Sequence, residues 1–230
     1  PMATKSLDAQ KMFICAKKNK KTLAVGHNRR FSSVFDFIHS LNDQKKIGKI
    51  LHIEANFSAP GALGYKKNFW RANRKESPGG AIAGLGIHMI DLMCQFGGKV
   101  ISIQSLVKKY AVKVNIDDTT SALFEFSNKC TGNLTTIFAC PYTSKFNIFG
   151  TSMNIFSEVD SNKIKIIHKN GNIKKLNLLD KKTLLLELEE FADSCIKKKQ
   201  FRIKNLEAIH NVKIMEGIVK SSKLNKKIYL

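Results

Sequence analysis

The stretch SPGGAIAGLGIHMIDLM, residues 77–93, places a glycine-rich turn directly before an apolar run of helical character. The run also carries His88 and Asp91, which lie three residues apart and therefore on a similar face of a helix. Ionisable groups are costly to bury among Leu, Ile and Met unless they have partners. The stretch therefore predicts a core helix with two candidate functional side chains, although a histidine in such a place is more often a satisfied core residue.

Hydrophobic periodicity predicts the elements on the N-terminal side of this helix. The spacing of apolar residues indicates helices near residues 6–16 and 34–41, and a short apolar run at 22–26 predicts a strand between them. Residues 49–57, KILHIEANF, alternate between apolar and polar side chains and predict a strand with one solvated side. Residues 58–80 are rich in Gly, Pro and polar side chains, and a loop of this length in a compact domain is usually functional.

Alternating and β-branched runs on the C-terminal side predict a large sheet. The predicted strands cover residues 100–107, 121–126, 134–140, 146–149, 153–159, 164–167 and 173–178. Two helices follow, near residues 184–195 and 206–219. The sequence therefore predicts an α+β fold with a large, mostly antiparallel sheet and helices on one face, preceded by a partial Rossmann-type βα segment.

The net charge of +21 invites a nucleic-acid hypothesis. Only five of the 39 basic residues are arginine, the residue that phosphate and base-edge recognition favours. The lysines lie in scattered pairs and form no long basic block. A composition biased toward Lys, Asn and Ile explains the charge better, and we expect no nucleic-acid partner.

The cysteines and the apolar runs bear on the compartment. The five cysteines are widely spaced and form no C-x-x-C pair, which is typical of reduced thiols in a cytoplasmic protein. No apolar run is long enough to span a bilayer, so we expect no membrane partner. No histidine spacing is typical of a metal site, and no metal is predicted.

Several stretches, in order along the chain, resemble one family, the Gfo/Idh/MocA oxidoreductases. They are PMATKSLDAQKM at 1–12, VGHNRRF at 25–31, KIGKILHIEANF at 46–57, FWR at 69–71, PGGAIAGLGIHMIDLM at 78–93, DDTTSALFEFSN at 117–128 and ELEEFADSCIKKKQ at 187–200. The resemblance implies an N-terminal Rossmann domain that binds NAD or NADP and a C-terminal α+β domain whose open sheet builds a homo-oligomer. Pro1 resembles the proline of the family's Glu-Lys-Pro element, whose lysine works in catalysis. We therefore expect an N-terminally truncated chain, with residues 1–30 as the end of the Rossmann domain and 31–230 as the substrate and oligomerisation domain.

The resemblance also implies roles for individual residues. His88 matches the family's catalytic histidine, whose imidazole can take a hydroxyl proton while a hydride leaves for the nicotinamide. The residues that would hold substrate are Asp91, Arg29 and Arg30, and those that would contact the cofactor are Asn28, Trp70 and Arg71. Purely structural roles are the alternatives: local pairing for Asp91, surface salt bridges for the arginines and an anchoring role under the loop for Trp70.

Position 84 departs from the pattern of the family. Many members carry an aspartate four residues before the histidine, and this chain has Gly84 there, which removes one candidate acid. The main hypothesis is an NAD(P)-dependent oxidoreductase acting on a sugar, cyclic polyol or sugar derivative, with this chain alone inactive. The alternative is a non-enzymatic protein, derived from the same family, that keeps the sheet for self-association.

Overall fold

The computed structural model describes residues 1–230 and contains five α-helices and nine strands. The helices are α1 (Ser6–Lys18), α2 (Ser33–Asp43), α3 (Ile87–Gly97), α4 (Thr183–Lys197) and α5 (Asn205–Leu224). The strands are β1 (Ile50–Ser58), β2 (Val100–Lys108), β3 (Thr119–Phe126), β4 (Thr131–Ile137), β5 (Thr143–Gly150), β6 (Met153–Glu158), β7 (Lys163–His168), β8 (Ile173–Asn177) and β9 (Ile228–Tyr229). No helix is long and apolar enough to cross a membrane.

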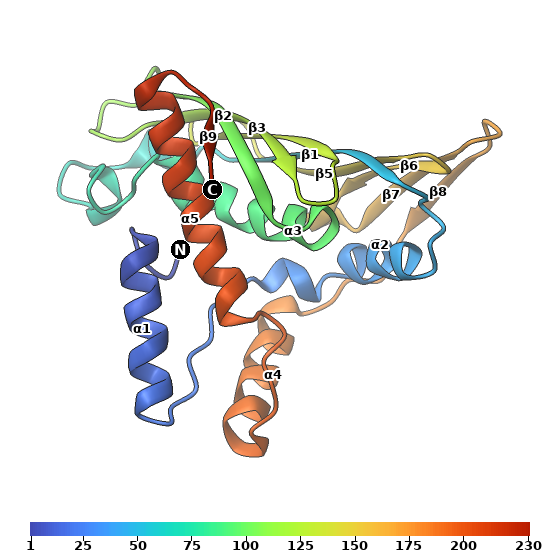
Figure 1. The fold of residues 1–230 in the computed structure, drawn as a ribbon. Helices are drawn as coiled ribbons and strands as arrows, with labels where there is room; N and C mark the ends of the chain where they lie inside the picture. Colours follow the sequence, from blue (N-terminus) through green and yellow to red (C-terminus); the bar gives the residue numbers. More distant parts are fainter.

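All nine strands join one sheet, which forms the upper layer of the molecule in Figure 1. The strand order is β8-β7-β6-β5-β1-β4-β3-β2-β9, and every neighbouring pair is antiparallel except β1 and β4. The predicted α+β class and mostly antiparallel sheet are confirmed. The parallel pair at the centre of the sheet was not predicted.

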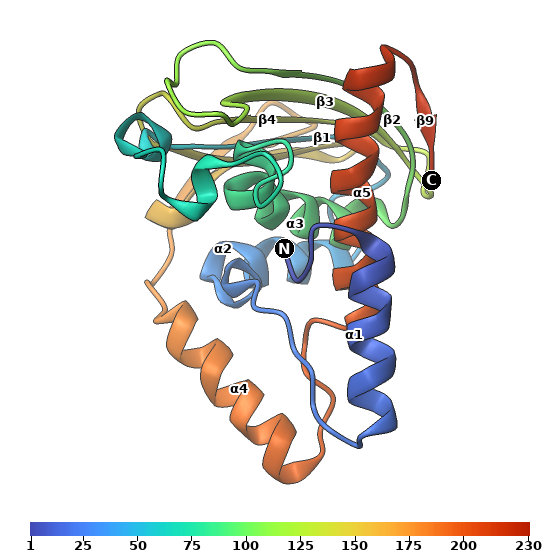
Figure 2. The same cartoon turned by 90° about the vertical axis from the view of Figure 1, so that its left-hand side faces the viewer.

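Helices α2, α3 and α5 lie on one side of the sheet (Figures 1 and 2), as predicted. The core between the layers includes Ile53, Leu134 and Ile148 from the central strands and Met89 and Ile90 from α3, all almost completely buried. Removing each such side chain from water contributes roughly 1.5–3 kcal/mol. Because α3 is packed under β1 and β4 in this way, its first turn has a fixed place beside the sheet.

The segment between α1 and α2 differs from the prediction. Residues 22–26 run without regular secondary structure, so the predicted strand there is wrong. Backbone groups form a strand only where a neighbouring strand supplies hydrogen bonds, and none lies beside this segment. At the other end of the chain, β9 pairs with β2, an element that the sequence did not indicate.

Helices α1 and α4 project away from the sheet (Figure 2). Helix α1 packs on α5, and α4 packs on the 3₁₀ turn Asn28–Phe31. Both helices leave large apolar side chains in water, among them Leu7 and Ile14 on α1 and Leu184, Leu188 and Ile196 on α4. Exposed apolar side chains in this number are typical of a surface that another unit covers.

Candidate functional site

A cavity of about 600 Å³ opens at the start of α3, and we call it the His88 cavity. Its wall combines the first residues of the chain, the segment 23–27, part of the long loop and the beginning of α3. The lining side chains that matter below are His27, Trp70, Arg71 and His88. Residues of the long loop 58–80, which the sequence predicts to be functional, therefore share this cavity with the start of α3.

Two glycines and a π-helical turn position His88 at the wall of this cavity. Gly79 and Gly80 adopt positive φ angles of 69° and 52°, and a Cβ atom on Gly80 would meet the backbone oxygen of Asp117. The π turn Ile82–Gly86 follows and leads directly into α3. Turns of this type often occur at functional sites because they re-aim the residues beside them. His88 is the second residue of the helix that results.

His88 lies against a second histidine. Its Nδ1 atom is 3.4 Å from Nδ1 of His27, and the two rings meet edge to face with an interplanar angle of 84°. Burial, aided by the positive charge of nearby groups such as Arg29, lowers the pKa of His88 to about 3. The ring is therefore neutral near pH 7, and its Nε2 atom makes no hydrogen bond within the protein.

Asp91 and Arg30 form a buried ion pair next to the two histidines. Arg30 donates hydrogen bonds of 2.6 Å to each carboxylate oxygen of Asp91, and Asn211 donates a third of 2.9 Å. Burial by itself raises the pKa of Asp91, but these bonds hold it below its ordinary value. Neither residue lines the His88 cavity and both are buried, so neither side chain faces a ligand in that cavity.

The remaining predicted residues divide between the cavity and its surroundings. Arg29 stacks its guanidinium 3.9 Å from the ring centre of Phe57 and pairs with Asp160 at 2.8 Å. The Asn28 amide donates to the Thr183 hydroxyl at 2.9 Å, which ties the turn to α4. Only His88, Trp70 and Arg71 line the same cavity, where the Arg71 guanidinium lies 4.8 Å from the Trp70 ring.

Phe138 occupies the space beside Gly84. A Cβ atom on Gly84 would lie 2.4 Å from the Cζ atom of the Phe138 ring, too close for any side chain without rearrangement. Phe138 is itself buried, in a small cluster under the long loop. The absence of an aspartate at position 84 is therefore matched by an aromatic ring that fills its place.

Sequence reasoning missed His27. Its spacing from the other histidines is not typical of metal ligands, and the structure contains no group of three or more His, Cys, Asp or Glu side chains arranged to hold a metal ion. The available signal was its position, directly before Asn28 and Arg29 at the end of an apolar run. Nothing in the sequence indicated that this segment faces α3.

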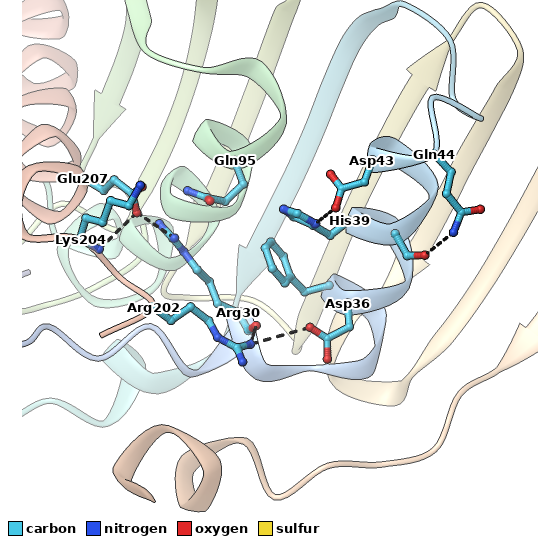
Figure 3. A pocket seen from close by; sticks show the side chains of 11 residues that line it. Arg30, Asp36, His39, Asp43, Gln44, Gln95, Arg202, Lys204 and Glu207 are labelled. Carbon is cyan, nitrogen blue, oxygen red and sulfur yellow. Dashed lines mark hydrogen bonds and ion pairs between the residues drawn. The ribbon is translucent and has the colours of Figure 1, made fainter. Parts of the chain in front are cut away.

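A second hollow, which we call the polar groove, lies between α2, the end of α3 and the start of α5 (Figure 3). Its volume is about 630 Å³, and its wall is almost entirely polar. Most of its ionisable side chains pair with one another, and the pairs are Arg30 with Glu207 at 2.8 Å, His39 with Asp43 at 2.8 Å and Arg202 with Asp36 at 3.8 Å, while Lys204 forms no ion pair. Because most of these groups already have partners, the groove offers few free groups for a charged ligand.

Comparisons with known proteins bear on the family. The family model described as GFO/IDH/MocA C-terminal domain matches residues 35–156. Glucose-6-phosphate 3-dehydrogenase of Bacillus subtilis is 27% identical over 183 residues, which are 78% of this chain and 52% of that protein. Trans-1,2-dihydrobenzene-1,2-diol dehydrogenase of Xenopus laevis is 26% identical, over 66% of this chain and 44% of that protein. The chain thus spans about half or less of the length of these curated relatives.

Solved structures share the fold over the whole chain. A putative NADPH-dependent oxidoreductase from Desulfitobacterium hafniense has a TM-score of 0.91 at 24% identity and covers 100% of this chain and 70% of that one. Levoglucosan dehydrogenase in complex with NADH has a TM-score of 0.88 at 15% identity, over 100% of this chain and 71% of that one. Identities this low show a common architecture and leave the chemistry to the residues of the site.

Proposed function

This chain belongs to the GFO/IDH/MocA family of oxidoreductases, and from that premise we propose that it serves an NAD(P)-dependent dehydrogenase acting on a sugar, cyclic polyol or sugar derivative. The observation that carries the proposal is the placement of His88. It stands at the start of a rigidly packed helix, lines a cavity with a half-exposed aromatic ring and an arginine, and keeps Nε2 free of protein partners. The named relatives that act on glucose-6-phosphate and on levoglucosan favour a carbohydrate substrate.

The chemistry follows from a neutral imidazole at the cavity wall. Oxidation of a secondary alcohol breaks an O–H bond and a C–H bond, and the O–H proton passes to Nε2 of His88. A bound nicotinamide would supply the acceptor for the hydride that leaves carbon. The residues that fit this group are Trp70, whose ring is 56% exposed and can stack on a planar ligand, and Arg71, whose guanidinium can pair with a phosphate or carboxamide oxygen.

Residues 1–30 and 31–230 have separate places in this proposal. We assign 31–230 to the substrate and oligomerisation domain, and 1–30 to the end of a nucleotide-binding domain. The apolar side chains that α1 and α4 leave exposed, such as Ile14 and Leu188, support this division because a nucleotide-binding domain seated there would cover them.

The single tryptophan makes cofactor binding directly measurable. Titration of the purified chain with NADH and with NADPH, followed by Trp70 emission, is expected to show saturable quenching. Replacing Arg71 with Ala should weaken the quenching, while replacing Lys169 with Ala, in the turn between β7 and β8, should leave it unchanged. The same titration on the product of the complete open reading frame is the stronger arm. Unsaturable quenching in both preparations would contradict the proposal.

His88→Ala tests the catalytic assignment. In a preparation that oxidises polyols or sugars, general acid–base catalysis of this kind contributes about 10²- to 10⁴-fold, and turnover should fall by that factor. His39→Ala, a surface histidine of α2, is the matched control and should retain the parent rate. Undiminished turnover in His88→Ala would exclude His88 as the general base.

The outer face of the sheet supports the competing account, a protein that only self-associates. Leu106 and Leu123, on neighbouring strands, are each more than half exposed on this face. Such side chains favour pairing of two sheets in a homo-oligomer. Light scattering that finds an oligomer, combined with no saturable NADH or NADPH binding, would favour this account over the dehydrogenase.

A further inference from the structure

We propose that His27 is a positioning residue that fixes which ring nitrogen of His88 carries the proton, so that Nε2 of His88 presents a lone pair to the cavity. The inference rests on the proposed catalytic role of His88 and adds a second histidine to its mechanism. It starts from one distance, the 3.4 Å between the two Nδ1 atoms. His27 is 3% exposed and directly precedes the 3₁₀ turn Asn28–Phe31, so its ring is held in place.

Two neutral imidazoles can share a hydrogen bond between their Nδ1 atoms in only two ways. One ring must be the Nδ1–H tautomer and donate, and the other must be the Nε2–H tautomer and accept. The tautomer of either ring therefore sets that of the other. If His27 accepts, His88 carries its proton on Nδ1 and its Nε2 is a base; if His27 donates, His88 Nε2–H is a donor and cannot take a proton from a hydroxyl.

The charges on the far side of His27 select the first arrangement. Nε2 of His27 lies 3.9 Å from the Asp91 carboxylate, too far for a hydrogen bond but close enough for a strong electrostatic attraction in a buried site. Arg30 is paired with two carboxylates, Asp91 at 2.6 Å and Glu207 at 2.8 Å, so this cluster carries one excess negative charge. A proton on Nε2 of His27 faces that excess charge, which leaves Nδ1 as the acceptor for His88.

Other groups near the two rings do not reverse this preference. The carboxylate of Glu187 accepts a hydrogen bond from the backbone N–H of His27 and so holds the segment, not the ring. Arg29 lies near His88, where its positive charge opposes protonation of the ring. Both histidines are neutral near pH 7, chiefly because burial lowers their pKa values.

The arrangement gives each proton a place during turnover. The substrate hydroxyl would lose its proton to Nε2 of His88 as the O–H bond breaks, while a bound nicotinamide would accept the hydride that leaves carbon with its electron pair. His88 then carries a positive charge with Nδ1–H still donated to His27. This bond to His27 couples the positive charge of His88 to the negative Asp91 cluster, as in other sites where a carboxylate orients a catalytic histidine.

Nuclear magnetic resonance of the chain labelled with ¹⁵N-histidine tests the inference without any cofactor. Long-range ¹H–¹⁵N correlation spectra at pH 7.5 distinguish protonated from unprotonated ring nitrogens. The expected pattern is Nδ1–H with a bare Nε2 for His88, and a bare Nδ1 with Nε2–H for His27. A His88 ring protonated on Nε2 in the parent chain overturns the proposal before any variant is made.

Two variants of His27 separate the acceptor from the bulk of the ring. His27→Phe keeps an aromatic ring and removes the acceptor, so the Nε2–H form of His88 should gain population. His27→Asn places an amide oxygen near the position of Nδ1 and should keep the parent tautomer. His39→Phe is the control for signal assignment and should leave the His88 signals unmoved. An unchanged His88 tautomer in a folded His27→Phe chain refutes the positioning role.

Kinetics distinguish a failure of this inference from a failure of the proposed function. In an active preparation His27→Phe should lower kcat at least about tenfold with little change in KM, and His27→Asn should recover most of the loss. A structural role alone would not give that rescue. If His88→Ala keeps full turnover, the proposed catalytic role of His88 fails even where the spectra show the expected tautomers. If His88→Ala is inactive but the spectra of the parent chain show His88 protonated on Nε2, only the tautomer proposal fails.

Discussion

Replacement of Asp91 by Asn should destabilise the fold more than any other single isosteric change near the site. The Asp91 side chain is 0% exposed and accepts three hydrogen bonds, two of them from Arg30 at 2.6 Å. The amide keeps the shape but removes the charge, and Arg30, itself 3% exposed, is left with Glu207 as its one carboxylate partner. Breaking a buried ion pair from one side costs about 3–5 kcal/mol. That is a large part of the roughly 5–15 kcal/mol that holds a typical domain together.

Urea denaturation at pH 7 measures the effect as a shift of the midpoint at constant slope. The matched control is Asp36→Asn, because Asp36 pairs with Lys181 but is 44% exposed and should cost less than about 1 kcal/mol. The double variant Arg30→Met with Asp91→Leu removes both charges and should be more stable than Asp91→Asn alone. A loss in Asp91→Asn no larger than in Asp36→Asn would refute the account of this pair.

Three further predictions concern stability. The pKa of His88 is about 3 in the folded chain and 6.5 ordinarily, so between these pH values the unfolded chain binds one more proton than the folded chain. The free energy of unfolding should therefore fall as pH drops below 6.5, by about 2 kcal/mol at pH 5, and urea melts of His88→Phe should lack that part of the loss. Gly84→Ala should cost about 1–3 kcal/mol through contact with the Phe138 ring, and Phe138→Leu should relieve it in the double variant; equal midpoints for Gly84→Ala and the parent would contradict the contact. Asp118→Ala should cost about 2–4 kcal/mol and speed amide hydrogen exchange at residues 110–112, whose three N–H groups donate to its carboxylate, and unchanged exchange there would count against this anchor.

Local periodicity was sufficient to predict most elements of this fold. Strands β2, β3 and β6 and helix α3 lie close to where alternating or helical patterns placed them, because each element buries one face against the core. The pairing of β1 with β4 was out of reach of this reasoning. Strand pairing depends on which segments the chain brings together over long separations, and nothing local in residues 50–58 records a parallel neighbour.

The sequence was sufficient to predict part of the site. His88 stood out because a titratable group in an apolar helix must be explained, and the structure places it on a cavity. Asp91 stood out for the same reason and Arg30 through the family resemblance, yet the two satisfy each other inside the protein. Residue type and spacing do not tell a group that faces a cavity from one that faces a partner. The contact of His27 with His88 joins residues 61 positions apart and is a product of tertiary structure.

The position of β1 in the sheet has a consequence for how the chain is made. Both of its neighbours, β4 and β5, lie far downstream, with about 70 residues of chain between the end of β1 and the start of β4. At the usual pace of synthesis, roughly 5–20 residues per second, the nascent β1 segment waits about 4–15 seconds for its first partner. Throughout that interval an alternating strand with two open edges is available to other chains. A chaperone that binds the nascent segment during this interval should therefore raise the yield of folded protein.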